Sequence, residues 1–353
     1  MTSSSTPTAY AVSPDSGEHW TAEGAWLVAE GIHRIPLPLP MDGLKAVNVY
    51  VIETEDGLTL VDGGWALDVA REVLERCLRQ LGAGFGDIDR FLVTHVHRDH
   101  YTMASVLAAE HGGKVSLGIE EKPALDYIHE HRWQISGGFR AALTRVGAVD
   151  LAAQWSADGD RPDLASWRYP DTWLEGDHAI EVGRRTLEAV HTPGHTPGHY
   201  VFVDASAELL FAGDHVLPTI TPSLGFTLPA AEDPLSDFMA SLTKVRALPD
   251  LRILPAHGPV APSSHARADE LLEHHEHRLG ESLSALSAGP SVAVDVAGRL
   301  GWTRHQRSFT ELDPFNQGMA AMETLVHLEV LVARGDATRT ETPEGALLFT
   351  RAE

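Results

Sequence analysis

Segments with the pattern of buried strands alternate with segments of helical pattern along the first 120 residues, and this alternation is the strongest constraint on the fold. Residues 46–64, AVNVYVIETEDGLTLVDGG, are two β-rich stretches joined at Glu55-Asp56-Gly57, which is a hairpin signal. The pattern continues with a helix over 66–84, a short strand over 89–96, a helix over 104–113 and a strand over 114–119. This order predicts an α/β fold with a layered sandwich architecture.

The strand pattern returns after residue 172. Residues 178–192 and 199–213 predict strands, 237–248 predicts a helix, and the apolar run RILPAHGPV follows at 252–260. Two strand-and-helix sets of similar order predict a duplicated αββα sandwich. Between the sets, residues 120–172 are helical pieces, and Trp133, Trp155, Trp167 and Trp173 fall in or directly after them. We interpret this insert either as a small separate core or as an aromatic lid over a site.

From about residue 265 to the C-terminus, the sequence pattern becomes mainly helical. Helical patterns cover 265–286, 291–302 and 317–340, and a short strand pattern covers 345–350. Three helices followed by a short hairpin give a winged-helix-like outline. We therefore expect a flexible N-terminal arm over 1–22, an α/β domain over 23–264 and a winged-helix-like domain over 265–353.

Composition removes several classes of function. No apolar run reaches the roughly 18–20 residues that a membrane-crossing helix needs, and the N-terminus lacks the basic start and apolar stretch of a secretory signal. The only cysteine, Cys77, excludes an intrachain disulfide and fits a reducing cytoplasm; we expect it to face the core from a helix. The formal net charge of −23 disfavours nucleic acid as a partner.

The stretch VTHVHRDHYT, residues 93–102, concentrates ligand-type side chains directly after an apolar run. In an extended segment, side chains two residues apart share a face, so His95 and His97 are expected to hold one cation together. The tight loop that follows is expected to turn Asp99 and His100 toward a second position. Imidazole nitrogens and carboxylate oxygens at this density suit Zn²⁺ or another divalent transition metal.

Three later segments end in similar residues. The loop VHTPGHTPGHY carries His191, His195 and His199, the strand LLFAGDHV ends in Gly213-Asp214, and ILPAHGPV ends in His257. Loops at the ends of strands converge at one edge of an α/β sheet, where sites are commonly built. The sequence therefore predicts a metal site assembled from four segments.

Taken together, the H-x-H-x-D-H, G-H-T-P-G-H, G-D and A-H-G motifs resemble those of the metallo-β-lactamase-fold hydrolases. The resemblance runs from about residue 46 to 260, and LTLVDGG with Asp62 matches an early strand of that family. It implies an αββα sandwich with a dinuclear centre at one edge. The first metal site would consist of His95, His97 and His195, the second of Asp99, His100 and His257, with Asp214 bridging both. We expect two divalent ions, with Zn²⁺ as the default and Fe or Mn accepted by the same ligands.

The resemblance also implies a mechanism. Two cations that share an oxygen lower its pKa, so that a metal-bridging hydroxide attacks a carbonyl or phosphoryl centre. Asp99 would orient this nucleophile and return a proton to the leaving group. Asp62 would hold a ligand histidine in the required tautomer, and His199 would support the ligand loop. We expect Trp133 and Trp167 to line a substrate pocket, and Tyr101 either to line it with them or to pack in the core. His274, His275 and His277 are on one predicted helix, where i, i+3 spacing is compatible with metal binding, but we expect them to lie on a solvated helix face.

The fold alone does not select an activity, but some residues narrow the choice. The Gly213-Asp214 pair argues against β-lactamases, which generally lack the bridging aspartate. Leu217 stands where quorum-signal lactonases carry tyrosine, and the 42 residues between Asp214 and His257 are too few for the inserted domain of the large nuclease branch. The chain looks most similar to the branch with a C-terminal winged-helix-like domain.

We therefore expect a hydrolase that acts on a small carbonyl substrate, an acyl thioester or ester. The alternative is a single-strand-specific endoribonuclease with the same dinuclear centre, but residues 261–353 hold 8 arginines and no lysine against 14 acidic residues. A non-catalytic metal-binding protein and an iron-dependent persulfide oxidase are further alternatives. Among partners we expect a small-molecule substrate and a second copy in a homodimer, with no membrane.

Overall fold

The computed structural model of the chain describes residues 20–40, 43–131, 135–154, 163–303 and 305–353. Their contacts divide the chain into two compact units. The first unit takes its described residues from Met1–Leu125, Asp163–Pro222 and Ser241–Asp269, and the second from Asp126–Pro162, Ser223–Ala240 and Glu270–Glu353. The domain limits expected from the sequence stay a prediction.

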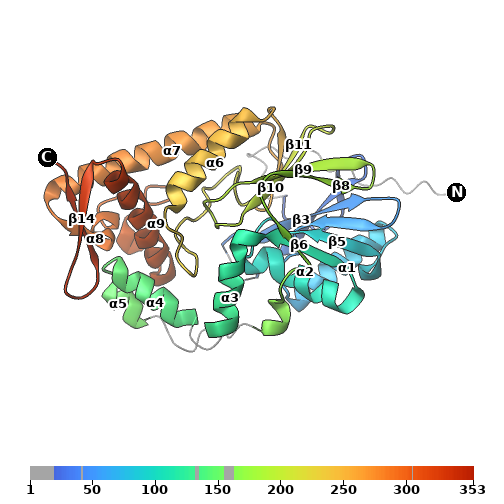
Figure 1. Cartoon of the computed structure of the whole chain (residues 1–353), viewed down its shortest axis with the longest axis horizontal. Coiled ribbons are helices and arrows are strands. Elements are labelled where there is room, and N and C mark those ends of the chain that lie inside the picture. The colour runs from blue at the N-terminus through green and yellow to red at the C-terminus, as the bar shows by residue number, and fades with distance from the viewer. Residues whose placement is uncertain (1–19, 41–42, 132–134, 155–162, 304) are drawn as a thin grey trace. The chain divides into compact units, whose positions relative to one another are not determined.

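The first unit contains a seven-stranded sheet whose strands follow one another in chain order (Figure 1). The strands are β1 (Trp26–Ala29), β2 (Ile32–Pro38), β3 (Ala46–Glu53), β4 (Leu58–Val61), β5 (Ile88–Leu92), β6 (Lys114–Gly118) and β7 (Thr172–Leu174). Strands β1 to β4 pair antiparallel, and β4 to β7 pair parallel. The predicted hairpin at residues 55–57 is confirmed, with Glu53 opposite Leu58.

Parallel neighbours need a crossover connection, and two helices provide it. Helix α1 (Asp68–Gln80) connects β4 to β5, and α2 (Arg98–His111) connects β5 to β6. The buried positions of α1 are Ala70, Val73, Leu74, Cys77 and Leu78, which is the spacing of one helical face. These side chains join a core with the outer face of the sheet, so Cys77 faces the core as predicted.

A second sheet of five strands packs against the first. It contains β8 (His178–Val182), β9 (Arg185–His191), β10 (Tyr200–Asp204), β11 (Leu209–Gly213) and β12 (Arg252–Pro255). One apolar cluster includes inward side chains of both sheets, among them Tyr50 and Phe211, whose rings meet edge to face at 5.5 Å. The parallel pair β11–β12 is joined through α6 (Pro234–Ala247). The predicted αββα sandwich is confirmed.

The second unit is mainly helical. It contains α4 (Ile135–Arg145), α5 (Val149–Gln154), α8 (Ala293–Ala297), α9 (Pro314–Ala333) and most of α3 (Lys122–His131) and α7 (Ser264–Ala285). A three-stranded sheet of order β13 (Ser291–Val292), β15 (Leu347–Arg351), β14 (Ala337–Glu341) completes it. The helix expected over 317–340 ends at Ala333, because Gly335 adopts a φ of 81° and the chain turns into β14. The winged-helix assignment stays a prediction.

Among the described residues, the structure has no helix that combines the length and the apolar character needed to cross a membrane.

Candidate metal centre

The four predicted segments meet at one end of the sandwich, but the first of them is not extended as expected. Strand β5 ends at Leu92, so His95 and His97 lie in the loop beyond it, and His97 is the N-cap residue of α2. Asp99 and His100 lie in the first turn of that helix. The two histidines therefore converge because the loop turns into a helix, and not because of strand alternation. His95 and His97 thus lie together as predicted, but the predicted cause, a shared face of one strand, was wrong.

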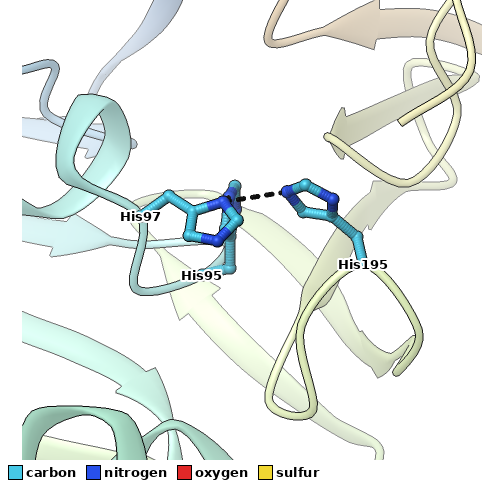
Figure 2. A group of neighbouring side chains, drawn as sticks. All are labelled: His95, His97 and His195. Carbon is cyan, nitrogen blue, oxygen red and sulfur yellow. Dashed lines mark hydrogen bonds between the residues drawn. The ribbon is translucent and has the colours of Figure 1, made fainter. Parts of the chain in front are cut away.

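Three imidazoles form a first group. His97 Nδ1 lies 3.0 Å from His95 Nε2 and 2.9 Å from His195 Nε2, and Figure 2 shows the rings of His97 and His195 directed at each other from separate loops. With a single proton, His97 Nδ1 cannot donate a full hydrogen bond to both neighbouring nitrogens. Separations close to these occur around one small cation, since Zn–N bonds of about 2.0–2.1 Å place tetrahedral ligands roughly 3.3 Å apart.

A second group lies beside the first. His257 Nε2 is 3.4 Å from Asp99 Oδ2, and His100 Nε2 is 3.6 Å from the same oxygen. Both Nε2 atoms are buried and, in the described part of the chain, have no hydrogen-bond partner. Buried polar atoms are rarely left without partners, so the surroundings of these two nitrogens fit a role as metal ligands.

Asp214 faces both groups. Its Oδ2 is 3.5 Å from His195 Nε2, while its Oδ1 is 3.4 Å from His257 Nε2 and 3.8 Å from His100 Nε2. Oδ1 is also buried without a hydrogen-bond partner among the residues described. Five imidazoles and two carboxylates are thus arranged as two triads, and the Asp214 carboxylate faces both. The triads are His95, His97 and His195, and Asp99, His100 and His257. This donor set suits Zn²⁺, Fe or Mn.

Asp62 and Thr94 fix the orientation of the ligand histidines. Asp62, with a φ of 62°, accepts a hydrogen bond from His100 Nδ1 at 2.9 Å and another from the Thr94 backbone N–H at 2.8 Å. The Thr94 hydroxyl donates to the same carboxylate and accepts from His95 Nδ1 at 3.0 Å. Because each Nδ1 keeps its proton in this network, each Nε2 presents a lone pair to the centre.

The remaining ligands are held in a similar way. His257 Nδ1 donates to the Ala46 carbonyl oxygen at 2.8 Å, which leaves its Nε2 free. His199 Nε2 accepts the Asp214 backbone N–H at 3.1 Å and its Nδ1 donates to Thr192, so His199 supports a ligand without facing the centre as one.

A buried glutamate connects two of the ligand loops. Glu121 accepts hydrogen bonds from the Thr196 hydroxyl and from the backbone N–H groups of Val96 and Gly198. Val96 lies between His95 and His97, and Thr196 follows His195. Sequence reasoning missed Glu121 and Thr94. Neither belongs to the ligand motifs, and only the structure shows which backbone groups they bind.

The electrostatics divide the centre into two halves. Burial and the neighbouring imidazoles lower the pKa of His97 to about 3 and hold the pKa of His95 well below its ordinary value, so both rings are neutral. Burial alone would raise the pKa of Asp99, but the electrostatic interactions with His100 and His257 outweigh it and hold the pKa below its usual range. Asp99 is therefore ionised.

The expected pocket residues have different positions. Tyr101 is completely buried in the core, and its hydroxyl donates to the Arg168 carbonyl oxygen. Of the two roles expected for Tyr101, the structure shows packing inside the protein and not the lining of an open pocket. Trp167 is half-buried against the same core, with its ring 6.4 Å from the Tyr101 ring. Trp133 lies outside the described residues.

An arginine beside the centre was not anticipated. Arg98 lies between His97 and Asp99 in sequence, is exposed, and stacks its guanidinium over the Trp65 ring at 4.0 Å. Thr102 fixes this pair, because its hydroxyl donates to the Arg98 carbonyl oxygen and accepts the Ala66 N–H. The stack is therefore tied to the first turn of α2, which also carries Asp99 and His100.

Comparison with known proteins agrees with the geometry. A solved structure of a metallo-beta-lactamase family protein from Thermus thermophilus is 29% identical, with a TM-score of 0.76, covering 92% of this chain and 100% of that chain. Lactamase-like protein aptB of Emericella nidulans is 28% identical over 74% of this chain and 67% of its own length. An atrochrysone carboxyl ACP thioesterase of Paecilomyces divaricatus is 35% identical over 35% of this chain and 39% of its own length.

A family profile described as the metallo-beta-lactamase superfamily matches residues 42–257. The match includes every residue of the two triads. The chain therefore belongs to the metallo-beta-lactamase superfamily of metal-dependent hydrolases.

Proposed function

We propose that the protein is a metal-dependent hydrolase of a small carbonyl substrate, an acyl thioester or ester. The observation that carries the proposal is the pair of triads that Asp214 faces, with Asp99 as the more exposed of the two carboxylates. The Asp99 side chain is 15% exposed, compared with 9% for Asp214. A reacting molecule that enters from solvent would therefore meet Asp99 first.

In the proposed centre, His95, His97 and His195 would hold one divalent ion and Asp99, His100 and His257 would hold the other, with the Asp214 carboxylate facing both groups of residues. When bound, such a metal pair polarises the substrate oxygen and makes water acidic enough to act as a nucleophile. Asp99 is ionised, so its carboxylate can accept a hydrogen bond from the attacking water and orient it. The same carboxylate would carry the proton to the leaving thiol or alcohol.

Two observations support a carbonyl substrate over a nucleic acid. The first observation is that a relative similar to part of this chain is named a thioesterase. That name describes the relative, and we use it here only to propose a substrate class. The formal net charge of −23 opposes the approach of a polyanion. A small acyl thioester meets less of this repulsion, and the exposed Arg98 would attract a single anionic group on it.

The experiment is turnover by the metal-loaded full-length protein on acyl thioesters, esters, lactones and single-stranded RNA. Asp99→Asn serves as the test variant, and Asp56→Asn, in the exposed turn between β3 and β4, serves as the matched control. We expect thioester or ester turnover that Asp99→Asn reduces by at least about 100-fold, the scale of a lost general acid–base group, and that Asp56→Asn leaves unchanged. RNA cleavage alone, lost in Asp99→Asn, would refute the proposal in favour of a ribonuclease.

A further inference from the structure

A second group of metal-ligand side chains lies in the second unit and shares no residue with the proposed catalytic centre. His275 comes from α7, and Glu323 and His327 come from α9. His275 is 0% exposed and His327 is 2% exposed. From the sequence, His275 and His277 were expected on one solvated helix face. The structure exposes 72% of the His277 side chain but buries His275 completely.

The spacing places these groups together. Glu323 and His327 are four residues apart, so they lie on the same face of α9, one turn from each other. One ligand atom from each of Glu323, His327 and His275 lies within 4.8 Å of the other two. Two helices thus contribute two imidazoles and one carboxylate to a single buried point.

The orientation of His327 is that of a ligand. Its Nδ1 donates to the Glu323 backbone carbonyl oxygen at 2.7 Å, so its Nε2 carries the lone pair. This Nε2 lies 3.2 Å from His275 Nδ1. His257 in the proposed catalytic centre is held in the same way, through a bond from its Nδ1 to a carbonyl oxygen. The nitrogen separation is also close to the 2.9 and 3.0 Å found within the first triad.

The surroundings of the Glu323 carboxylate favour a bound cation. The Glu323 carboxylate accepts the Leu224 backbone N–H at 3.0 Å, and burial raises its pKa to about 7. Arg278 is a cation that acts on Glu323, but its guanidinium is already bonded to Glu281 and to the Gly301 carbonyl oxygen. A half-buried carboxylate beside two neutral imidazoles is an environment that a divalent cation stabilises.

We propose that His275, Glu323 and His327 form a structural metal site that joins α7 to α9. Two imidazole nitrogens and one carboxylate oxygen are a ligand set that Zn²⁺ accepts. Because His275 and His327 are buried and Glu323 is half-buried, the ion would contribute to the stability of the second unit and not to hydrolysis. In a chain without the ion, His275 Nδ1 would instead donate a simple hydrogen bond to His327 Nε2.

The test is the metal content of the full-length protein after loading with Zn²⁺ and removal of unbound ions. His327→Gln and Glu323→Gln are the test variants, and His277→Gln on α7 is the control because its side chain is exposed. We expect both test variants to contain one zinc ion fewer per chain than the wild type and the control. The difference between proteins is the readout, so it does not depend on how many ions the catalytic centre holds.

A second measurement covers the case in which the buried variants do not fold. Crystals of zinc-loaded wild-type protein measured at the zinc absorption edge would show an anomalous peak between His275 Nδ1 and His327 Nε2. Equal zinc content in all four proteins, or no peak at this position in fully loaded crystals, would leave only the histidine–histidine hydrogen bond and overturn the proposal. Neither readout depends on whether the protein hydrolyses a thioester.

Discussion

The carboxylate of Asp62 accepts a hydrogen bond from His100 Nδ1 at 2.9 Å, and both side chains are buried, 2% and 0% exposed. Asp62 stands directly after β4 and His100 in the first turn of α2, 38 residues later. The bond therefore links two segments that the sheet brings together. It decides which nitrogen of His100 faces the proposed metal ions.

Asp62→Ala should weaken metal binding. Without the carboxylate, His100 Nδ1 and the Thr94 N–H lose their acceptor, and the imidazole is free to rotate or change tautomer. Losses of such supporting contacts typically reduce metal affinity by about 10–100-fold. Competition with a chromophoric chelator would measure the change. Asp56→Ala, in the exposed turn before β4, should retain wild-type affinity, and equal affinity in the two variants would contradict the role assigned to Asp62.

Gly213→Ala should disrupt the centre through steric crowding. Gly213 adopts a φ of 50°, and a Cβ there would lie 2.7 Å from His199 Nε2 and 2.8 Å from Thr94 Cβ. Either the neighbours or Asp214 must move, at a cost of about 1–3 kcal/mol in unfolding free energy beyond the backbone strain. Denaturant unfolding and metal content would measure both effects.

Gly82→Ala separates strain from crowding. Gly82 has a φ of 76°, but a Cβ there would meet no atom within 4 Å. We expect it to lose about 1 kcal/mol from the left-handed backbone alone while keeping its metal. If Gly82→Ala loses metal to the same extent as Gly213→Ala, the crowding argument is wrong.

Glu121→Ala should loosen the two ligand loops that it connects. The Val96 and Gly198 N–H groups would be left without their buried acceptor, which costs about 1–3 kcal/mol for each group that stays dry. We expect reduced metal retention on dialysis together with a lower melting temperature. Glu120→Ala is the control, because that side chain is 39% exposed. Wild-type retention in both variants would show that the loops hold their positions without Glu121.

Arg98→Gln should alter substrate preference without altering the chemistry. In the described part of the chain no ion pair with Arg98 is found; its guanidinium is stacked over Trp65, and in sequence it stands between the proposed ligands His97 and Asp99. An exposed ion pair with a substrate anion contributes up to about 1 kcal/mol, so KM for an anionic acyl thioester should rise roughly two- to five-fold. A neutral thioester should show no change in KM, and kcat should stay constant for both. An equal rise in KM for both substrates would contradict this role and indicate that Arg98 acts only by stabilising the fold.

Cys77 should resist thiol reagents in the folded protein. Its side chain is buried in α1, and burial raises the pKa of the thiol to about 11. At a pH of about 8 the thiolate, which is the reactive form, is therefore scarce until the protein unfolds. Labelling by a disulfide reagent along a denaturant series should follow the loss of circular dichroism, whereas rapid labelling without denaturant would contradict this burial.

The proposed ligand residues came from the sequence through the resemblance of the H-x-H-x-D-H, G-H-T-P-G-H, G-D and A-H-G motifs to a known family, and the structure brings these residues together. The αββα layers could also be predicted, since the spacing of apolar residues separates strands from helices. The end of β5 at Leu92 could not be predicted from the sequence. Hydrogen bonds formed in the tertiary structure, at β5 and at the start of α2, fix where the strand pairing stops.

The contacts that hold the ligands were decided by the tertiary structure alone. Glu121, Thr94 and Ala46 carry no motif, and they act through hydrogen bonds to groups up to 211 residues away. The pattern HHEHR predicted an exposed helix face, yet packing against α9 buries His275 beside His327 and leaves His277 in solvent. A sequence determines the period of a helix and the types of its side chains, but which side of that helix meets another element depends on residues far along the chain.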